Sequence, residues 1–199
     1  TLVISLGTGI PAAYAFSRKR FPGRKAILKM LILLYAFPSL LSMTALYKLL
    51  SPMGLINTRT GLVIVYTGTM AVFALWNMKG YFDTIPVEIE EAAMIDGCNP
   101  LQTFFGVVMP ILKPTAITVA ILNAMWIWND YLLPYLVIGL STNYKTIPVV
   151  VQYLVGSYGA KDLGAMMALL VLSVIPIIVF YLTCQKYIIE GVVAGAVKG

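Results

Sequence analysis

An acid-rich segment in the middle of the chain holds the residues whose types and spacing point most directly to a function. Residues 79–113 contain five of the eight acidic residues of the protein. Within this segment Thr84 stands in a capping position, Pro86 follows it, acids occupy the next turns and Gly97 comes last. Because these signals begin and end helices, the sequence predicts a short helix over 84–97.

A second helix start follows at once. Asn99 is a residue type that caps helices, and Pro100 suits the first helical position because its missing N–H needs no partner there. The pattern continues over 101–109 before Pro110 and Pro114, which are expected to end the helix. The sequence therefore predicts two short helices that meet at an angle.

Two such helices at a membrane surface would expose their acids to solvent. The small side chains of Ala92 and Ala93 would let another surface approach the backbone, which favours a docking element. A plain amphipathic connector between two membrane spans fits the same residues. Spacing alone does not separate the two interpretations.

Polar residues within a later apolar stretch form a second candidate site. Asn123 and Trp126 lie three positions apart, and Asn129 continues the same helical face. Polar side chains inside a membrane span are costly and therefore often functional. Two amides and an indole ring on one face would bind a sugar through hydrogen bonds and an aromatic platform.

Each of these residues also has a structural interpretation. Trp126 and Trp128, near the end of a span, are typical of the aromatic belt at a membrane interface. Asn123 would equally well hydrogen-bond a neighbouring helix. Asp130 is expected to order the turn before Pro134 or to meet a partner.

The chain offers little for enzymatic chemistry. It has no histidine, which excludes serine–histidine and cysteine–histidine catalysis, and Cys98 and Cys184 are too far apart to indicate a disulfide framework or a zinc site. It also has no Gly-x-x-x-x-Gly-Lys-Ser/Thr loop for phosphates. We therefore expect a non-enzyme that binds no cofactor and no metal, with any ATP bound by another chain.

The composition places the protein in a membrane. Of its 199 residues 60% are hydrophobic and only 11% are charged, whereas soluble domains are about half apolar and about a quarter charged. We expect an all-α, polytopic transmembrane helical bundle with five spans, two of them kinked at Pro38 and Pro176. The predicted spans are 1–16, 30–47, 61–78, 114–133 and 163–185.

The basic residues predict the orientation. Six lie between Arg18 and Lys29, a stretch expected to be a loop, and ten of the fourteen fall on one side of the membrane. The other four are Lys48, Arg59, Lys145 and Lys161. This distribution places residues 80–113 and the tail 186–199 in the cytoplasm, and it accounts for the net charge of +6 without a nucleic-acid partner.

Two further patterns concern helix packing. Ser5, Gly9, Ala13 and Ser17 recur at every fourth position, which predicts a small-residue face suited to close helix contact. Between the last two predicted spans, residues such as Gly156 interrupt apolar runs that are too short to cross, which suggests interfacial or re-entrant pieces. In the tail, Gly191 and Gly195 indicate turns.

The acid-rich segment resembles the EAA loop of type I ABC importer permeases. Glu91-Ala92-Ala93, then Gly97, then the run 107–110 fit that pattern, with Val107 and Met109 as apolar departures from it. The resemblance implies a coupling helix that sits in a cleft of a cytoplasmic ABC ATPase dimer, which binds ATP and Mg. The coupling residues that it implies are Glu91, Ala92, Ala93, Asp96, Gly97 and Pro110.

The resemblance extends along the chain and narrows to the carbohydrate branch typified by maltose permeases. Its marks are the runs 11–18, 54–58, 128–131 and 194–199. It implies one permease domain over 1–199 in the bacterial inner membrane, with a second permease subunit and an extracytoplasmic solute-binding protein as partners. Such permeases usually have six spans, so we expect an N-terminally truncated chain that lacks the first.

The function expected from all of this is ATP-driven, binding-protein-dependent sugar import. A polyol or glycerophosphate substrate is the near alternative, because close relatives of this branch handle both. An ion-coupled secondary transporter is the alternative from another class. It is disfavoured because every charged side chain can be placed at a span boundary or in a loop.

Overall fold

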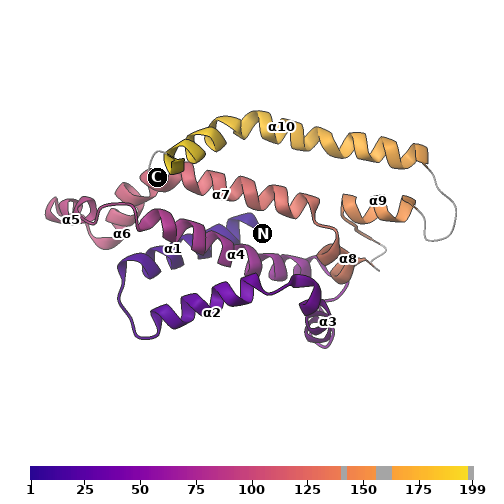
Figure 1. Ribbon diagram of the computed structural model, residues 1–199, viewed down its shortest axis with the longest axis horizontal. Helices are drawn as coiled ribbons and strands as arrows, with labels where there is room; N and C mark the ends of the chain where they lie inside the picture. Colours follow the sequence, from indigo (N-terminus) through magenta and orange to yellow (C-terminus); the bar gives the residue numbers. More distant parts are fainter. Residues whose placement is uncertain (140–142, 156–162, 197–199) are drawn as a thin grey trace. The chain divides into compact units, whose positions relative to one another are not determined.

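A computed structural model describes residues 1–139, 143–155 and 163–196, with side chains left aside for Val155 and for 187–196. Over these residues the protein is helical and has no strand, which confirms the all-α prediction. Gly156, Lys161 and the last three residues, which the sequence analysis used, lie outside the described part. Figure 1 shows the helices in chain order.

The contacts within the chain form two compact units, described here one at a time. One comprises Thr1, 36–67 and 124–185, and the other 2–35, 68–123 and the C-terminal residues from 186. The helices are α1 (Leu2–Arg18), α2 (Arg24–Ala36), α3 (Ser39–Leu50), α4 (Arg59–Phe82), α5 (Glu88–Ile95), α6 (Pro100–Gln102), the π-helix η1 (Thr103–Val108), α7 (Met109–Asn129), α8 (Leu132–Ile138), α9 (Ile147–Val155) and α10 (Leu163–Ala196).

Three helical stretches are long and apolar enough to cross a membrane: α4, the continuous run Pro100–Asn129, and α10 over Leu163–Lys186. The pair α2 and α3 counts as a fourth span only if its break is included, because the chain leaves the helix before Pro38. α1 has 17 residues and a length of about 26 Å, at the lower limit for a bilayer core of about 30 Å. The prediction of five spans is therefore confirmed for three.

Several predicted boundaries were wrong. α2 begins at Arg24, so half of the basic stretch expected as a loop is helical. The span containing Pro38 is two helices rather than one kinked helix. α10 continues through Ala196, where turns at Gly191 and Gly195 were expected. The two short helices α8 and α9 match the prediction of pieces too short to cross.

The small-residue face of α1 packs on α4, as predicted. Ser5, Gly9 and Ala13 are buried, and a Cβ placed on Gly9 would lie 2.8 Å from the Cβ of Ala74 and 3.1 Å from the carbonyl oxygen of Ala71. Real Cβ atoms almost never approach that closely, so only glycine permits this separation of the two backbones. The contact holds the two helices side by side in their unit.

A separate small core forms in the other unit. Leu50 at the end of α3 packs with Val137 and Ile138 of α8. The loop before α4 is fixed to this core by Asn57, whose φ is 58° and whose N–H donates to the Val137 carbonyl at 2.7 Å. The Tyr144 hydroxyl donates to the Asn57 carbonyl at 2.8 Å.

Replacing Gly9 with leucine is expected to destabilise the protein, because the α1–α4 contact has no room for a side chain. Overpacking of this kind costs about 1–3 kcal/mol. Gly7→Leu is the matched control, since a Cβ at Gly7 of the same helix meets nothing within 4 Å. Thermal unfolding in detergent should show a lower midpoint for Gly9→Leu alone, and equal midpoints for the two variants would contradict the packing.

Candidate coupling site

The coupling segment, residues 80–113, contains the short helix α5. Glu88, Glu90 and Glu91 stand in the first turn of α5, where negative charge favours the helix N-terminus. The helix ends at Ile95, and Gly97, which follows the cap residue Asp96, has a φ of 88° in the left-handed region that glycine adopts without strain. The Gly97 N–H donates to the Met94 carbonyl and the Cys98 N–H to the Ala93 carbonyl, which closes the helix end.

The start of α5 differs from the prediction. Thr84 stands four residues before the helix and not at its N-cap, and its hydroxyl donates to the Tyr81 carbonyl at 2.8 Å. α5 begins at Glu88, and the residue before it, Val87, makes no side-chain capping bond. The predicted helix 84–97 was therefore four residues too long at its start and two at its end, although the glycine that follows the helix is where it was expected.

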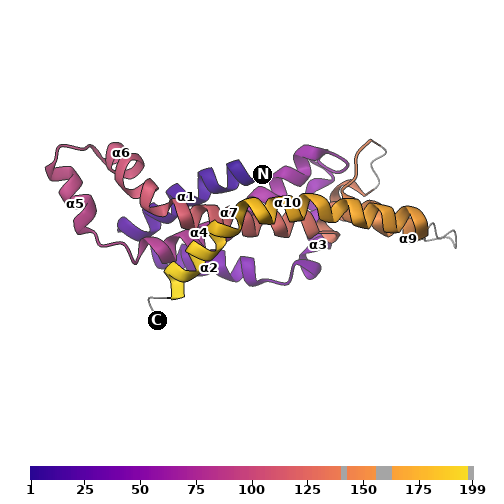
Figure 2. The same cartoon turned by 90° about the horizontal axis from the view of Figure 1, so that it is seen from above.

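The second helix of the segment begins as predicted and ends much later. The Asn99 side chain accepts from the N–H groups of Leu101 and Gln102, and the Gln102 side chain accepts from the Asn99 N–H, which completes a capping box. Figure 2 shows α5 and α6 as separate short helices joined by a turn.

The second helix does not end at its prolines. It passes through η1 into α7 and contains Pro110 and Pro114. The N–H of Met109 bonds to the Phe104 carbonyl five residues back, so a wider π turn directly precedes Pro110, a residue that lacks an N–H. The fourth predicted span therefore begins at the coupling segment itself.

A buried ion pair joins α5 to the end of α1. Glu90 is 4% exposed, and its carboxylate accepts from Arg18 Nε at 2.6 Å and from the Tyr14 hydroxyl at 2.7 Å. The Nη2 of Arg18 also donates to the Ile85 carbonyl at 2.8 Å. The expectation that the acids of this segment are solvent-exposed was thus wrong for Glu90. The neighbouring acids Glu88 and Glu91 are exposed.

A second polar contact ties α1 to the end of α4. The Ser17 hydroxyl donates to one oxygen of the Asp83 carboxylate at 2.6 Å, and Lys79 forms an ion pair with the other at 2.5 Å. Burial disfavours the charged form of Asp83, but these two hydrogen bonds outweigh it, so the pKa of the Asp83 carboxyl lies below its ordinary value. Asp83 is therefore held as a carboxylate.

Aromatic side chains fill the space beneath these polar contacts. The Tyr14 ring meets the Phe82 ring edge to face at 5.5 Å and the Phe104 ring at 4.9 Å. Phe82 ends α4 and Phe104 lies in η1, and both rings are buried in the core of this unit. Tyr14 thus brings the end of α1, the end of α4, α5 and η1 together at one point.

The predicted coupling residues divide into two groups in the structure. Ala93 is buried, whereas Glu91, Ala92, Asp96 and Gly97 are exposed on α5 and its C-terminal turn, and Pro110 is exposed in α7. Large apolar side chains that were not predicted as coupling residues are also exposed in this segment. They are Met94 (47%), Ile95 (86%), Leu101 (70%) and Phe105 (64%). Exposed apolar residues rimmed by acids are typical of a protein-binding surface.

The residues predicted to contact a sugar have three different environments. Asn123 is 2% exposed, and its Nδ2 has no hydrogen-bond partner in the described part of the chain. Trp126 is 54% exposed and meets the Tyr66 ring edge to face at 6.5 Å. Asn129 is exposed and donates to the Met125 carbonyl at 2.7 Å. No common site for the three is formed by these contacts.

Asn129 instead lines a hollow with a different tryptophan. A cavity of about 190 Å³ between α7 and α10 includes Trp128, Asn129, Pro176 and Phe180. Asp130 orders the turn after α7, as predicted, because one carboxylate oxygen accepts from the Leu132 N–H at 3.1 Å. Its other oxygen accepts from the Tyr66 hydroxyl at 2.8 Å.

Apolar helices of membrane length define a multi-pass membrane protein that carries an exposed acidic and apolar elbow. The family described as binding-protein-dependent transport system inner membrane component matches residues 5–193, and the chain belongs to this family. It is therefore a transport subunit of the inner membrane and not an enzyme. One family model covers both compact units.

Individual relatives agree with this assignment. The chain is 36% identical to the inner membrane ABC transporter permease protein YcjP of Escherichia coli, over 99% of this chain and 70% of that protein. It is 36% identical to the trehalose transport system permease protein SugB of Mycobacterium tuberculosis, over 100% of this chain and 73% of that protein. The maltose/maltodextrin permease protein MalG of Vibrio vulnificus is also 36% identical, with 100% and 67% covered.

A solved structure has the same fold. A chain in the crystal structure of a bacterial ABC transporter involved in the import of the acidic polysaccharide alginate superposes with a TM-score of 0.73 at 26% identity. The match covers 93% of this chain and 69% of that one. The fold is therefore that of an ABC importer permease.

Removing the charge of Glu90 is expected to loosen α5, because Arg18 would then lack its buried partner. Breaking a buried ion pair costs about 3–5 kcal/mol. In Glu90→Gln, the amides of α5 should exchange with solvent hydrogen faster, whereas Glu88→Gln, an exposed acid of the same helix, should leave exchange unchanged. The double variant Arg18→Gln/Glu90→Gln should lose less stability than the two single variants lose together. Strictly additive losses would contradict an interaction between Arg18 and Glu90.

Proposed function

We propose that this chain is a sugar-translocating permease subunit of an ATP-driven, binding-protein-dependent importer. In this proposal α5 docks on a cytoplasmic ATPase dimer that binds ATP and Mg, and a second permease subunit and a solute-binding protein complete the assembly. The observation that carries the proposal is the double character of α5: one face is buried and ion-paired, and the other is exposed.

The exposed face supports docking. Glu91, Ala92 and Asp96 lie there with Met94 and Ile95, so the surface offers negative charge, apolar contact area and a small residue that lets a partner approach the backbone. Ile95 is 86% exposed, which is costly for an isoleucine that water alone covers. A partner that buries this side chain and pairs with the acids would recover that cost.

The buried face supports transmission of movement. Glu90 is held by Arg18 and Tyr14, and Ala93 is buried, so a force on α5 acts on α1 through short, charge-assisted contacts. α1 in turn packs on α4 at Gly9 with no free space. Closure of the ATPase would thus move these helices together as a rigid body, the kind of motion by which transporters alternate between open states.

The names of the relatives support a sugar as the substrate. They are permeases for trehalose, for maltose and maltodextrin, and for melibiose, raffinose and stachyose. In our proposal Asn123, Trp126 and Asn129 lie along the substrate path, with Trp128 beside Asn129. A polyol or a glycerophosphate is the alternative, and uptake of labelled maltose and glycerol 3-phosphate by the reconstituted importer would distinguish them.

Replacing Gly97 with valine is expected to uncouple the importer. A left-handed backbone costs a residue with a side chain about 1–2 kcal/mol, so the end of α5 should shift and both binding-protein-stimulated ATP hydrolysis and sugar uptake should fall about tenfold. Gly54→Val is the matched control, because Gly54 also has a positive φ of 66° and open space around it. The assay uses the complete importer in proteoliposomes.

If hydrolysis and uptake remain at wild-type values in Gly97→Val, the coupling role of this turn is refuted. If both glycine variants lose activity to the same extent, the effect is one of general strain and the coupling role is refuted as well.

The orientation is tested with Cys98, a partly exposed thiol beside Gly97. In a Cys184→Ser background, a membrane-impermeant maleimide should label Cys98 in inside-out vesicles and leave it unlabelled in intact cells or spheroplasts. Labelling from the external side alone would place the coupling segment on the wrong side of the membrane for an ATPase, and the proposed function would fail.

A further inference from the structure

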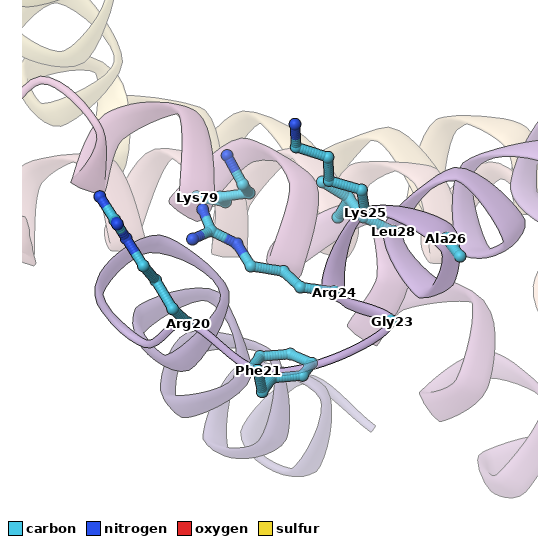
Figure 3. Close-up of a pocket in the computed structure, with 8 residues that line it drawn as sticks. All are labelled: Arg20, Phe21, Gly23, Arg24, Lys25, Ala26, Leu28 and Lys79. Carbon is cyan, nitrogen blue, oxygen red and sulfur yellow. The ribbon is translucent and has the colours of Figure 1, made fainter.

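A cavity of about 830 Å³ lies beside the coupling segment, at the same end of α4. It is lined by the loop between α1 and α2, by the first turns of α2, and by Lys79 of α4. Its four charged residues are all cations: Arg20, Arg24, Lys25 and Lys79. Figure 3 shows the charged ends of Arg24 and Lys79 close to one another, with Arg20 rising from the loop beside them.

Little negative charge balances these cations. Lys79 is paired with Asp83, and the same carboxylate also attracts Arg24, which donates to the Lys19 carbonyl at 3.3 Å. Arg20 and Lys25 form no ion pair within the described residues. α2 has no acidic residue in its first turn, so Arg24 and Lys25 stand at the positive end of the helix dipole, where cations are unfavourable. A bound anion would reverse this unfavourable electrostatic energy.

The loop that lines the cavity is held in one conformation. The Phe21 ring packs edge to face on the Phe16 ring of α1 at 5.2 Å. Gly23 has a φ of 79°, and the Arg24 N–H donates to the Phe21 carbonyl at 3.3 Å. The cations are therefore presented from a shaped turn between two helices.

An apolar stripe leaves the cavity along α2. Ala26, which lines the cavity, is followed at i+4 and i+7 by Met30 and Leu33, which are 53% and 71% exposed. A free phosphate or a nucleotide would have no use for this stripe. A molecule with an anionic head and hydrocarbon chains matches both the cavity and the stripe.

We propose that this cavity, the basic pocket, binds the phosphate-bearing head group of an anionic membrane lipid, with the acyl chains along Ala26, Met30 and Leu33. Basic pockets between membrane helices bind such head groups when they lie at the surface of the leaflet. The pocket lies in the leaflet nearest the coupling segment, and only the naming of that leaflet as cytoplasmic rests on the proposed function.

The experiment compares two double variants that remove the same charge. Arg20→Gln/Lys25→Gln neutralises two exposed cations of the pocket, and Lys19→Gln/Lys29→Gln neutralises two exposed cations of the same stretch that do not line it. Arg24 is left intact because it holds the loop carbonyl of Lys19. The complete importer is placed in nanodiscs, and immobilised spin-labelled phosphatidylglycerol and phosphatidylcholine are measured by electron paramagnetic resonance.

We expect the wild type and the Lys19/Lys29 control to prefer phosphatidylglycerol over phosphatidylcholine. In the pocket variant this preference should fall about fivefold for each cation removed. An equal loss in both variants would show diffuse surface charge and overturn the proposal, as would no loss in either. Competition by millimolar inorganic phosphate as effective as that by the lipid would assign the pocket to free phosphate and overturn the lipid. A preference seen in the isolated subunit and lost in the complete importer would show that a partner protein covers the pocket, which also overturns it.

The measurement requires no ATP hydrolysis and no sugar. If no lipid preference is found, the proposed coupling function is unaffected. If the coupling function is refuted, the proposed lipid site is unaffected.

Discussion

The buried carboxylate of Glu90 is the constraint on which the arrangement around the coupling segment depends. A carboxylate taken out of water costs several kcal/mol unless a countercharge and hydrogen bonds replace its hydration. Arg18 and Tyr14 supply both, from positions one helical turn apart on α1. Glu90 can therefore be buried only when the end of α1 lies against α5, and the same contacts fix Ile85 through the second nitrogen of Arg18.

This contact is possible because α1 lies unusually close to α4. The approach of Gly9 to Ala74 sets the separation of the two helices, and Ser17 continues the same small-residue face to Asp83 at the end of α4. Tyr14 and Arg18 lie beside that face, so the depth of helix packing within the apolar region determines whether they reach Glu90. Packing in the apolar region and polar contacts at its edge are thus one structural unit.

The sequence predicts features that depend on neighbouring residues and misses contacts between residues far apart in the chain. The helix cap at Asn99, the glycine just after α5 and the small face of α1 depend on residues within a few positions of one another, and all three are confirmed. The Glu90–Arg18 contact joins residues 72 positions apart, and charge counting treats one as an exposed acid and the other as a loop cation. The prediction that the helix ends at Pro110 was wrong for another reason. Proline is expected to end helices, but here a π turn precedes it and the helix continues. The three predicted sugar-contact residues lie in different environments, because helical spacing does not determine which neighbours cover a face.

The length of α5 explains why one side of this helix must be held by the rest of its unit. Eight residues are too few for a helix to be stable in water on its own, so tertiary contacts must hold it. Glu90 and Ala93 are buried on the side of those contacts, whereas Glu91, Ala92 and Asp96 are exposed. The two adjacent alanines therefore differ in environment: Ala93 lets the helix pack closely on its own unit, and Ala92 is exposed. If α5 docks as proposed, a force on its exposed surface would reach Arg18 directly through Glu90.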